Sequence, residues 1–478
     1  MADFNWTISV VMQVEEEREI EEKYSEFIRF INDQSPNPAI KYILLVYKNT
    51  RTGGQKIEIQ RLVKKRATDI LTQVPSTNIP NNDLFNKSTL IAFFKHHVLN
   101  ESADRHMLIT WGHGAGLGFF AERQNALIRS FAFNTEAIKP LQDFVDYSHV
   151  ERFLRANGYA RKIRNSSATT MQKFLKTNNV LANNRRRAEL TRQPELLDFF
   201  KYKLIPVEDF ADILKETFTD SGKKIDVMFT LNCYMQMFET GFCLKDQVDI
   251  LVAPVTAIPF QGIDYNSLFK KINAGNASPE DIAREIVTSY PKIYENDPNF
   301  TPQRYKLTAL KLNNHQEMLK QINQYCDIFK DRFTSGATYQ SPGSNFRIPF
   351  NGHVKRARRN CEDHTKGDER HFIALAEFFV LLNKQFSDLT PRENDLLACS
   401  SKIVELIRGS ITASFPVITP GSSVEKILPF ISIFFPDKKD SPEHHIKFFI
   451  ETLLTGDDTP FERAFRWDNF LIEYLKTL

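Results

Sequence analysis

The sequence predicts an α/β protein built on a mostly parallel sheet that carries helices on both faces. Short apolar runs rich in β-branched residues recur along the first 330 residues, and turn residues bound each of them. Amphipathic segments of helical length lie between these runs, and such alternation is typical of a parallel sheet flanked by helices. Two of the runs end on chemically reactive residues, which is where open α/β sheets place their chemistry.

The elements of residues 1–330 follow from periodicity and from cap or turn residues. The run KYILLVY is almost continuously apolar, which indicates a buried strand. Ser88 caps one predicted helix, Gly222 ends another, and Pro279 opens a third. We expect strands at 6–14, 41–47, 56–63, 106–110, 225–233, 249–255 and 305–312, and helices at 15–31, 89–99, 207–218, 278–290 and 316–329.

The remaining residues, 331–478, predict a mainly helical C-terminal subdomain. Residues 335–359 are rich in Gly, Ser, Asn and basic residues, so we expect a linker there. We expect helices at 371–386, 395–408 and 461–478, and a late strand at 431–435 that Pro436 ends. The chain therefore divides into an α/β domain at 1–330 and a helical subdomain at 331–478.

Residues 151–200 interrupt the α/β pattern with a strongly basic insertion. They hold eleven Lys or Arg against four Asp or Glu, and Arg185, Arg186 and Arg187 are consecutive. One interpretation is a solvated insertion with two short helices. The other is an exposed activation segment with the three arginines as its processing site, because long polar loops inside compact domains are usually functional or disordered. The sequence leaves both open.

Charge and cysteine usage exclude several function classes. A formal net charge of +3, from 62 basic and 59 acidic residues, is too balanced for a protein whose main partner is nucleic acid or a membrane surface. No apolar run approaches the roughly 18 residues that span a bilayer, and the first residues resemble no secretory signal. The five cysteines form no CxxC pair, so we expect no disulfide framework, no metal site and a reducing, cytoplasmic location.

The two reactive residues at strand ends are His113 and Cys233. His113 lies in the glycine-rich turn of LITWGHGAGLG, where the chain must turn tightly with its backbone exposed. Cys233 ends the run IDVMFTLNC and precedes a helix-like segment at 234–244, and a helix N-terminus favours the thiolate. Alone, the histidine is explained as a turn residue and the cysteine as a small core residue. Together they predict a nucleophile and its base.

The chain resembles the clostripain-like cysteine peptidases of the caspase–gingipain clan through five landmarks in the same order. The first is the family's Trp-x-His-Gly-x-Gly motif, and the second is its Asp-Ala-Cys-Leu-Met strand end, which is Leu-Asn-Cys-Tyr-Met here. The others are the segment after the next strand, the late strand ISIFFP and the closing helix FRWDNFL. The matching positions are Trp111, His113, Gly114, Gly116, 231–235, Glu239, Ala253, Pro259, Gly262, Tyr265, 431–436 and 465–471.

This resemblance implies a caspase-like fold and the hydrolysis of peptide bonds. Cys233 would be the nucleophile and His113 the general base and acid. The backbone N–H groups of Gly114 and Cys233 would form the oxyanion hole. Caspase-like sites need no third carboxylate, and we nominate none. We expect no required cofactor and no metal, and leave a calcium activator open without assigning ligands.

The chain departs from the family at the pocket for the residue before the scissile bond. The family's acidic residue two positions before the nucleophile is Leu231 here, and its Glu-Glu pair after the next strand is replaced by Val255 and Thr256. A buried carboxylate is what pairs with a substrate Arg or Lys. The sequence therefore predicts that Leu231, Val255 and Thr256 line a pocket for an apolar residue.

The main alternative is a catalytically inactive caspase-like scaffold that binds a partner. An esterase-type hydrolase would need a Gly-x-Ser-x-Gly elbow, and the sequence contains none. For the active enzyme we expect a monomeric, intracellular endopeptidase that acts on a protein or peptide. One candidate substrate is a gasdermin-like pore-former in bacterial antiviral defence, a hypothesis that rests on no particular residue.

Overall fold

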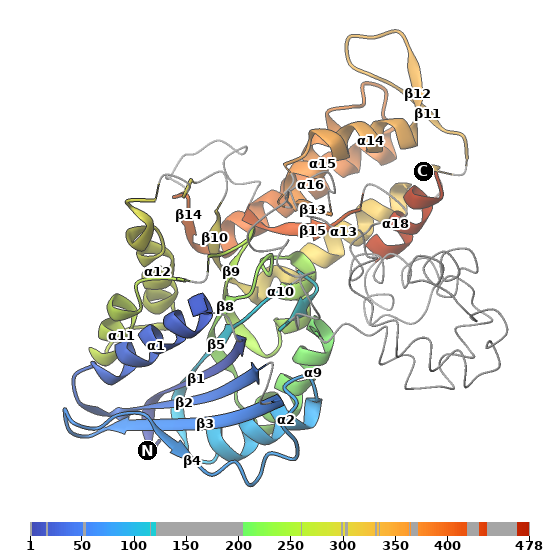
Figure 1. The fold of residues 1–478 in the computed structure, drawn as a ribbon. Helices are drawn as coiled ribbons and strands as arrows, with labels where there is room; N and C mark the ends of the chain where they lie inside the picture. Colours follow the sequence, from blue (N-terminus) through green and yellow to red (C-terminus); the bar gives the residue numbers. More distant parts are fainter. Residues whose placement is uncertain are drawn as a thin grey trace, which may run out of the picture. The chain divides into compact units, whose positions relative to one another are not determined.

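The structure is a computed structural model, drawn as a ribbon in Figure 1. Its described residues belong to one compact unit, which spans 1–121, 204–437 and 460–478. The predicted insertion at 151–200, with the predicted processing site Arg185, Arg186 and Arg187, lies outside the described residues, and the domain boundary after residue 330 stays a prediction. The described residues are 2–15, 18–50, 54–114, 116–120, 204–259, 261–297, 300–301, 305–329, 332–333, 335–362, 364, 371–417, 430–436 and 466–477.

A nine-stranded sheet forms the core of this unit, with the strand order β14-β10-β9-β8-β5-β1-β2-β3-β4. The five inner strands run parallel, and the two strands at each edge are antiparallel to their neighbours. The predicted fold class is therefore confirmed, with antiparallel additions at both edges. The strands are β1 (Phe4–Glu15), β2 (Asn37–Thr50), β3 (Gly54–Lys64), β4 (Thr72–Val74), β5 (Ala103–Trp111), β8 (Ile225–Leu231), β9 (Val248–Pro254), β10 (Leu307–Lys311) and β14 (Ile411–Phe415).

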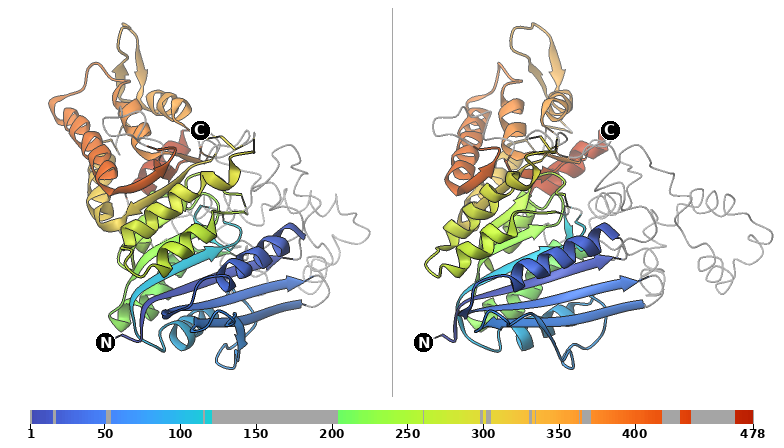
Figure 2. Two further views of the ribbon diagram at one scale, coloured as in Figure 1. Left: turned by 90° about the vertical axis from the view of Figure 1, so that its left-hand side faces the viewer. Right: turned by 60° about the vertical axis from the view of Figure 1, so that its left-hand side comes forward.

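Helices cover both faces of this sheet, as the two views of Figure 2 show. On one face lie α1 (Arg18–Asn32), α11 (Tyr265–Asn273) and α12 (Pro279–Ser289), and the rings of Phe27 and Tyr265 join the first two at 4.8 Å. On the other face, α2 (Lys87–Phe93), the π-helix η1 (Phe94–Val98) and α9 (Val207–Thr217) share one apolar cluster with the inner strands. Amphipathic helices bury one stripe each in this way.

The remaining described elements lie outside the nine-stranded sheet and its covering helices, and those from α13 onward belong to the C-terminal part of the chain. No described helix is both long enough and apolar enough to cross a bilayer. The elements are β6 (Gly118–Phe119), β7 (Ile205–Pro206), η3 (Thr219–Ser221), α10 (Phe238–Leu244), η4 (Pro291–Tyr294), η5 (Leu312–Asn314), α13 (His315–Phe329), β11 (Thr338–Gln340), β12 (Arg347–Pro349), α14 (Phe350–Asn360), β13 (Phe372–Ala374), α15 (Leu375–Asn383), α16 (Pro391–Ser410), β15 (Ser432–Phe434) and α18 (Trp467–Lys476).

Three local predictions outside the candidate site are wrong. The linker expected at 335–359 is instead the hairpin β11–β12 followed by α14, whose buried residues Phe350, Val354 and Ala357 recur at helical spacing. The helix expected from residue 371 begins only after a short strand, β13. Asn86, rather than Ser88, caps α2, because its side chain accepts a hydrogen bond from the backbone N–H of Ser88.

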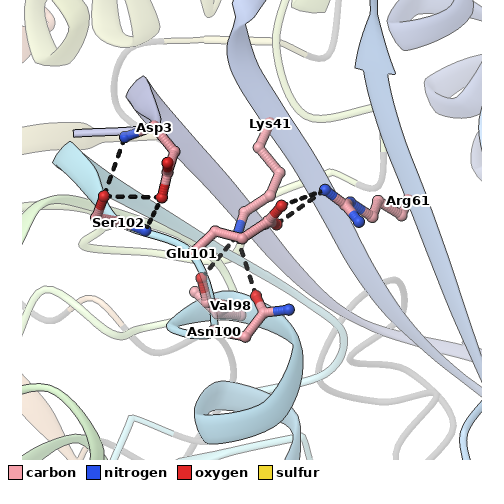
Figure 3. A network of polar contacts seen from close by, with 7 residues as sticks. All are labelled: Asp3, Lys41, Arg61, Val98, Asn100, Glu101 and Ser102. Carbon is pink, nitrogen blue, oxygen red and sulfur yellow. Dashed lines mark hydrogen bonds and ion pairs between the residues drawn. The ribbon is translucent and has the colours of Figure 1, made fainter. Parts of the chain in front are cut away.

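A buried lysine joins β2 to the loop before β5 (Figure 3). The Nζ atom of Lys41 donates to the carbonyl oxygen of Val98 at 2.9 Å and lies 3.2 Å from a carboxylate oxygen of Glu101. Arg61 donates to both carboxylate oxygens of Glu101, at 2.7 and 2.8 Å. Burial lowers the pKa of Lys41, although Glu101 opposes that shift. The folded state therefore depends on Glu101 to neutralise a cation that has left water.

We expect Glu101→Gln to destabilise the protein more than Lys41→Met. The glutamine leaves Lys41 buried without its counter-charge, at a cost of about 3 kcal/mol. The methionine removes the cation and keeps the volume, so we expect a loss of about 1 kcal/mol from the unsatisfied acceptors. Urea unfolding of both variants measures this. Equal losses, or a greater loss in Lys41→Met, would show that Glu101 does not stabilise the lysine.

Candidate active site

His113 and Cys233 follow two neighbouring parallel strands, each at the same distance from its strand end. Trp111, the last residue of β5, pairs in register with Leu231, the last residue of β8. His113 and Cys233 each come two residues later. Because the carboxyl ends of parallel strands meet at one edge of a sheet, the structure places both side chains at the same edge.

The turn that carries His113 lies directly against the backbone at Cys233. A Cβ atom added to Gly114 would lie 2.6 Å from the Cβ of Asn232 and 2.9 Å from the backbone nitrogen of Cys233. No other residue fits there without displacing the backbone of Cys233. Farther along the turn, the backbone N–H of Gly116 donates to the carbonyl oxygen of Cys233 at 3.4 Å. The glycines predicted to turn the chain therefore also permit this close approach.

Asn232 ties the two strand ends together through its fully buried side chain. Its Nδ2 donates to the carbonyl oxygen of His113 at 2.8 Å. Its Oδ1 accepts from the hydroxyls of Thr110 and Thr230, at 2.7 and 2.9 Å. Sequence reasoning missed this role. The available signal was one threonine near the end of each apolar run, at positions that pair in register.

Burial controls the electrostatics of His113. The side chain is 4% exposed, and desolvation lowers the pKa of its imidazole to about 4. The imidazole is therefore neutral at neutral pH, which is the form that accepts a proton from a thiol. Cys233 is 6% exposed, and its Sγ lies 4.0 Å from the carbonyl oxygen of Ile258, to which the thiol donates.

The helix expected directly after Cys233 begins later than predicted. Tyr234 has a positive φ of 62°, and its backbone N–H donates to the carbonyl oxygen of Thr256. The helix α10 starts only at Phe238 and has seven residues. Cys233 is therefore not at a helix N-terminus, and the predicted stabilisation of its thiolate by a helix dipole is wrong.

The three residues predicted to line the substrate pocket are buried close to Cys233. Leu231 is 3% exposed, and its Cδ2 would lie 3.0 Å from a Cβ added to Gly262. Val255 follows β9 and is fully buried, and the hydroxyl of Thr256 accepts from the backbone N–H of Lys306 at 3.0 Å. Their contact with substrate stays a prediction, as does the oxyanion hole at Gly114 and Cys233.

Glu239 carries a buried carboxyl group on α10, six residues after Cys233. It is 3% exposed, and its Oε1 accepts from the backbone N–H of Phe434 in β15 at 2.8 Å. Burial raises the pKa of this carboxyl to about 7, against the lowering effect of that hydrogen bond. Glu239 therefore links the helix after Cys233 to β15, and burial keeps its carboxyl group largely protonated up to about pH 7.

We expect the free energy of unfolding of Glu239→Gln, measured relative to the wild type, to be higher at pH 8 than at pH 5. Between its ordinary pKa of 4.5 and about 7, the unfolded carboxyl ionises while the buried one stays protonated, so wild-type stability falls as pH rises. Glutamine does not titrate, which makes the variant gain about 3 kcal/mol over this range. Thermal unfolding at both pH values measures the gain. Glu216→Gln is the control, because the side chain of Glu216 is 52% exposed. An equal gain in this control would contradict the raised pKa of Glu239.

The part of the chain that the structure describes contains no group of three or more His, Cys, Asp or Glu side chains able to hold a metal ion. The groups at this edge of the sheet include a thiol and a neutral imidazole, which are the components of a nucleophile and its base.

The comparisons with known proteins identify a family for the chain. The model of the clostripain family matches residues 196–474, more than half of the chain, and that stretch includes Cys233. No curated protein matches the chain.

Two solved structures are similar in fold. The inactive zymogen of a C11 protease from Parabacteroides distasonis has a TM-score of 0.54 and 10% identity, over 97% of this chain and 99% of that chain. A secreted C11 cysteine protease from Bacteroides thetaiotaomicron has a TM-score of 0.51 and 8% identity, over 91% of this chain and 94% of that chain. These likenesses confirm the predicted fold class.

Proposed function

Because the chain belongs to the clostripain family of cysteine proteases, we propose that it hydrolyses peptide bonds with Cys233 as nucleophile and His113 as general base. The observation that carries this proposal is the pairing of the two strand ends through Asn232, which donates to the carbonyl oxygen of His113. That contact fixes the backbone of one residue next to the backbone of the other. Proximity of this kind is what a nucleophile and its base require.

The reaction follows from the groups at the site. His113 takes the thiol proton while Sγ of Cys233 attacks the substrate carbonyl carbon, and backbone N–H groups of Gly114 and Cys233 stabilise the resulting oxyanion. The protonated imidazole then gives its proton to the leaving amine as the C–N bond breaks, leaving a thioester. His113 next takes a proton from water, whose oxygen attacks the thioester. Sγ leaves with that proton, and the carboxylic acid product is released.

We extend the proposal to an apolar preference in the pocket beside Leu231. Trp111, its register partner, lines a cavity of about 240 Å³ together with Phe27, Ile263 and Tyr265, whereas Leu231 itself, Val255 and Thr256 do not line it. Two carboxylates also line this cavity, and both have partners. Glu26 is 2.9 Å from Lys23, and Asp264 caps α11 through Ser267. These pairs leave no uncommitted carboxylate for a substrate guanidinium among the described residues that line the cavity.

The cellular setting is a further proposal. All five cysteines are free thiols, which supports a reducing compartment such as the cytoplasm. A calcium activator, a monomeric state and a gasdermin-like protein substrate stay predictions that rest on no described contact.

Alkylation of the native protein with iodoacetamide, read out by mass spectrometry, separates the enzyme from an inactive scaffold. Cys243 is more exposed than Cys233, but burial raises the pKa of its thiol well above the ordinary value. Exposure alone therefore predicts that Cys243 reacts first, whereas an activated nucleophile predicts Cys233. We expect Cys233 to react fastest, and to lose that advantage in His113→Ala. Faster reaction at Cys243 in the wild type would support the scaffold.

A further inference from the structure

Phe372, 139 residues after Cys233, contacts both the turn that carries His113 and the loop that follows Cys233. A Cβ atom added to Gly116 would lie 2.7 Å from Cζ of Phe372, and the ring centroid of Phe372 is 5.7 Å from that of Tyr234. Gly116 follows His113 by three residues, and Tyr234 directly follows Cys233. The ring is 1% exposed, so it packs between the two loops and not against solvent.

We propose that Phe372 is a positioning residue for the Cys233–His113 pair, an inference that rests on the proposed function. Both loop residues that it touches have a positive φ, 73° at Gly116 and 62° at Tyr234. A tyrosine adopts this backbone geometry only under strain, so surrounding contacts must hold it. The Phe372 ring supplies such a contact to both residues at once.

Phe372 is itself held in place by strands that are hydrogen-bonded to the chain after Cys233. It pairs in register with Phe434, so that β13 and β15 form a two-stranded ribbon. The backbone N–H of Ser432 donates to the carbonyl oxygen of Gln236 at 3.0 Å, and that of Phe434 donates to Glu239 at 2.8 Å. The ribbon of β13 and β15, from the C-terminal part of the chain, therefore holds Phe372 against the two loops that carry His113 and Cys233.

Replacing Phe372 with alanine tests the proposal by steady-state kinetics and by alkylation of Cys233. We expect kcat to fall about 100-fold with KM nearly unchanged, because displacement of the pair by about 1 Å has that effect. Phe372→Leu should recover most of the activity. The matched control is Phe378→Ala, which removes a fully buried ring from the same region whose ring contacts are with Phe379, Phe435, Trp467 and Phe470. This control should lose stability but keep its kcat.

Two outcomes would overturn the positioning role. One is a fall in kcat of equal size in Phe372→Ala and Phe378→Ala, which would show a general loss of stability. The other is an unchanged kcat in Phe372→Ala. The alkylation rate of Cys233 keeps this test independent of the proposed function. If the wild type hydrolyses no peptide, the function fails, whereas an unchanged alkylation rate in Phe372→Ala overturns the positioning role alone.

Discussion

Replacing Cys233 with alanine should abolish peptide hydrolysis while the fold remains intact. The thiol is the only group at this strand end that can form the thioester, so we expect a loss of about a millionfold in kcat. His113→Ala should cost nearly as much, and the double variant should be no worse than Cys233→Ala, because residues that act as one unit are not additive. Hydrolysis of a fluorogenic peptide library measures all three.

The control for this experiment is Cys243→Ala, which removes a partly exposed thiol from α10. It should retain wild-type turnover. Circular dichroism and thermal unfolding should show that Cys233→Ala is folded, since the side chain it loses is small. Turnover in His113→Ala above about one per cent of the wild-type rate would contradict its assignment as the base, because general base catalysis contributes at least about a hundredfold.

The second large effect that we expect is in substrate preference. A substrate guanidinium beside Leu231 would lose its hydration without gaining a partner, at a cost of several kcal/mol. A leucine would instead gain roughly 1.5–3 kcal/mol from burial. Together, the desolvation cost for arginine and the burial gain for leucine correspond to a preference for leucine of about a thousandfold or more in kcat/KM. Paired peptides that differ only in leucine or arginine before the scissile bond measure it.

Leu231→Asp supplies the reciprocal test of this pocket. Restoring the acidic residue of the family pattern should shift the preference toward arginine. Leu231→Asn is the matched control, because it adds a polar side chain of similar size without the charge. Faster hydrolysis of the arginine peptide by the wild type would show that another carboxylate reaches the pocket. An unchanged preference in Leu231→Asp would place Leu231 outside it.

The edge of the sheet that holds the candidate site could be predicted because its signals are local. The apolar runs at 106–110 and 225–233 indicate buried strands, and residues at the ends of such strands must lie at the carboxyl end of a parallel sheet. In the structure these strands end at Trp111 and Leu231. The glycines around His113 indicate a tight turn without any knowledge of the partner strand. Strand pairing then brings the cysteine and the histidine together.

The contacts that position these residues could not be predicted, because each joins distant parts of the chain. Asn232 contacts the carbonyl oxygen of a residue 119 positions away, and Glu239 contacts a backbone N–H 195 positions away. Phe372 lies in a segment whose sequence fits a helix as well as a strand. Local patterns specify elements, but they do not specify which buried side chain meets which loop.

The misassigned linker at 335–359 has a different cause. Its average composition is polar, because α14 carries basic residues on its exposed side. Its apolar positions, Phe350, Val354 and Ala357, still recur at the spacing of one helical face. Composition averaged over the segment hid a periodicity that was present, so this error was avoidable from the sequence alone.

The central claim is that Cys233 is the nucleophile at an active site that binds peptides, and a peptidyl chloromethyl ketone with leucine beside the warhead tests it most directly. Such a reagent must dock as a substrate does before a thiolate displaces its chloride. We expect one adduct per chain, on Cys233, with loss of activity in proportion to labelling and no adduct in Cys233→Ala or His113→Ala. An adduct on any of the other four cysteines that inactivates the enzyme, or full activity after Cys233 is labelled, would contradict the account.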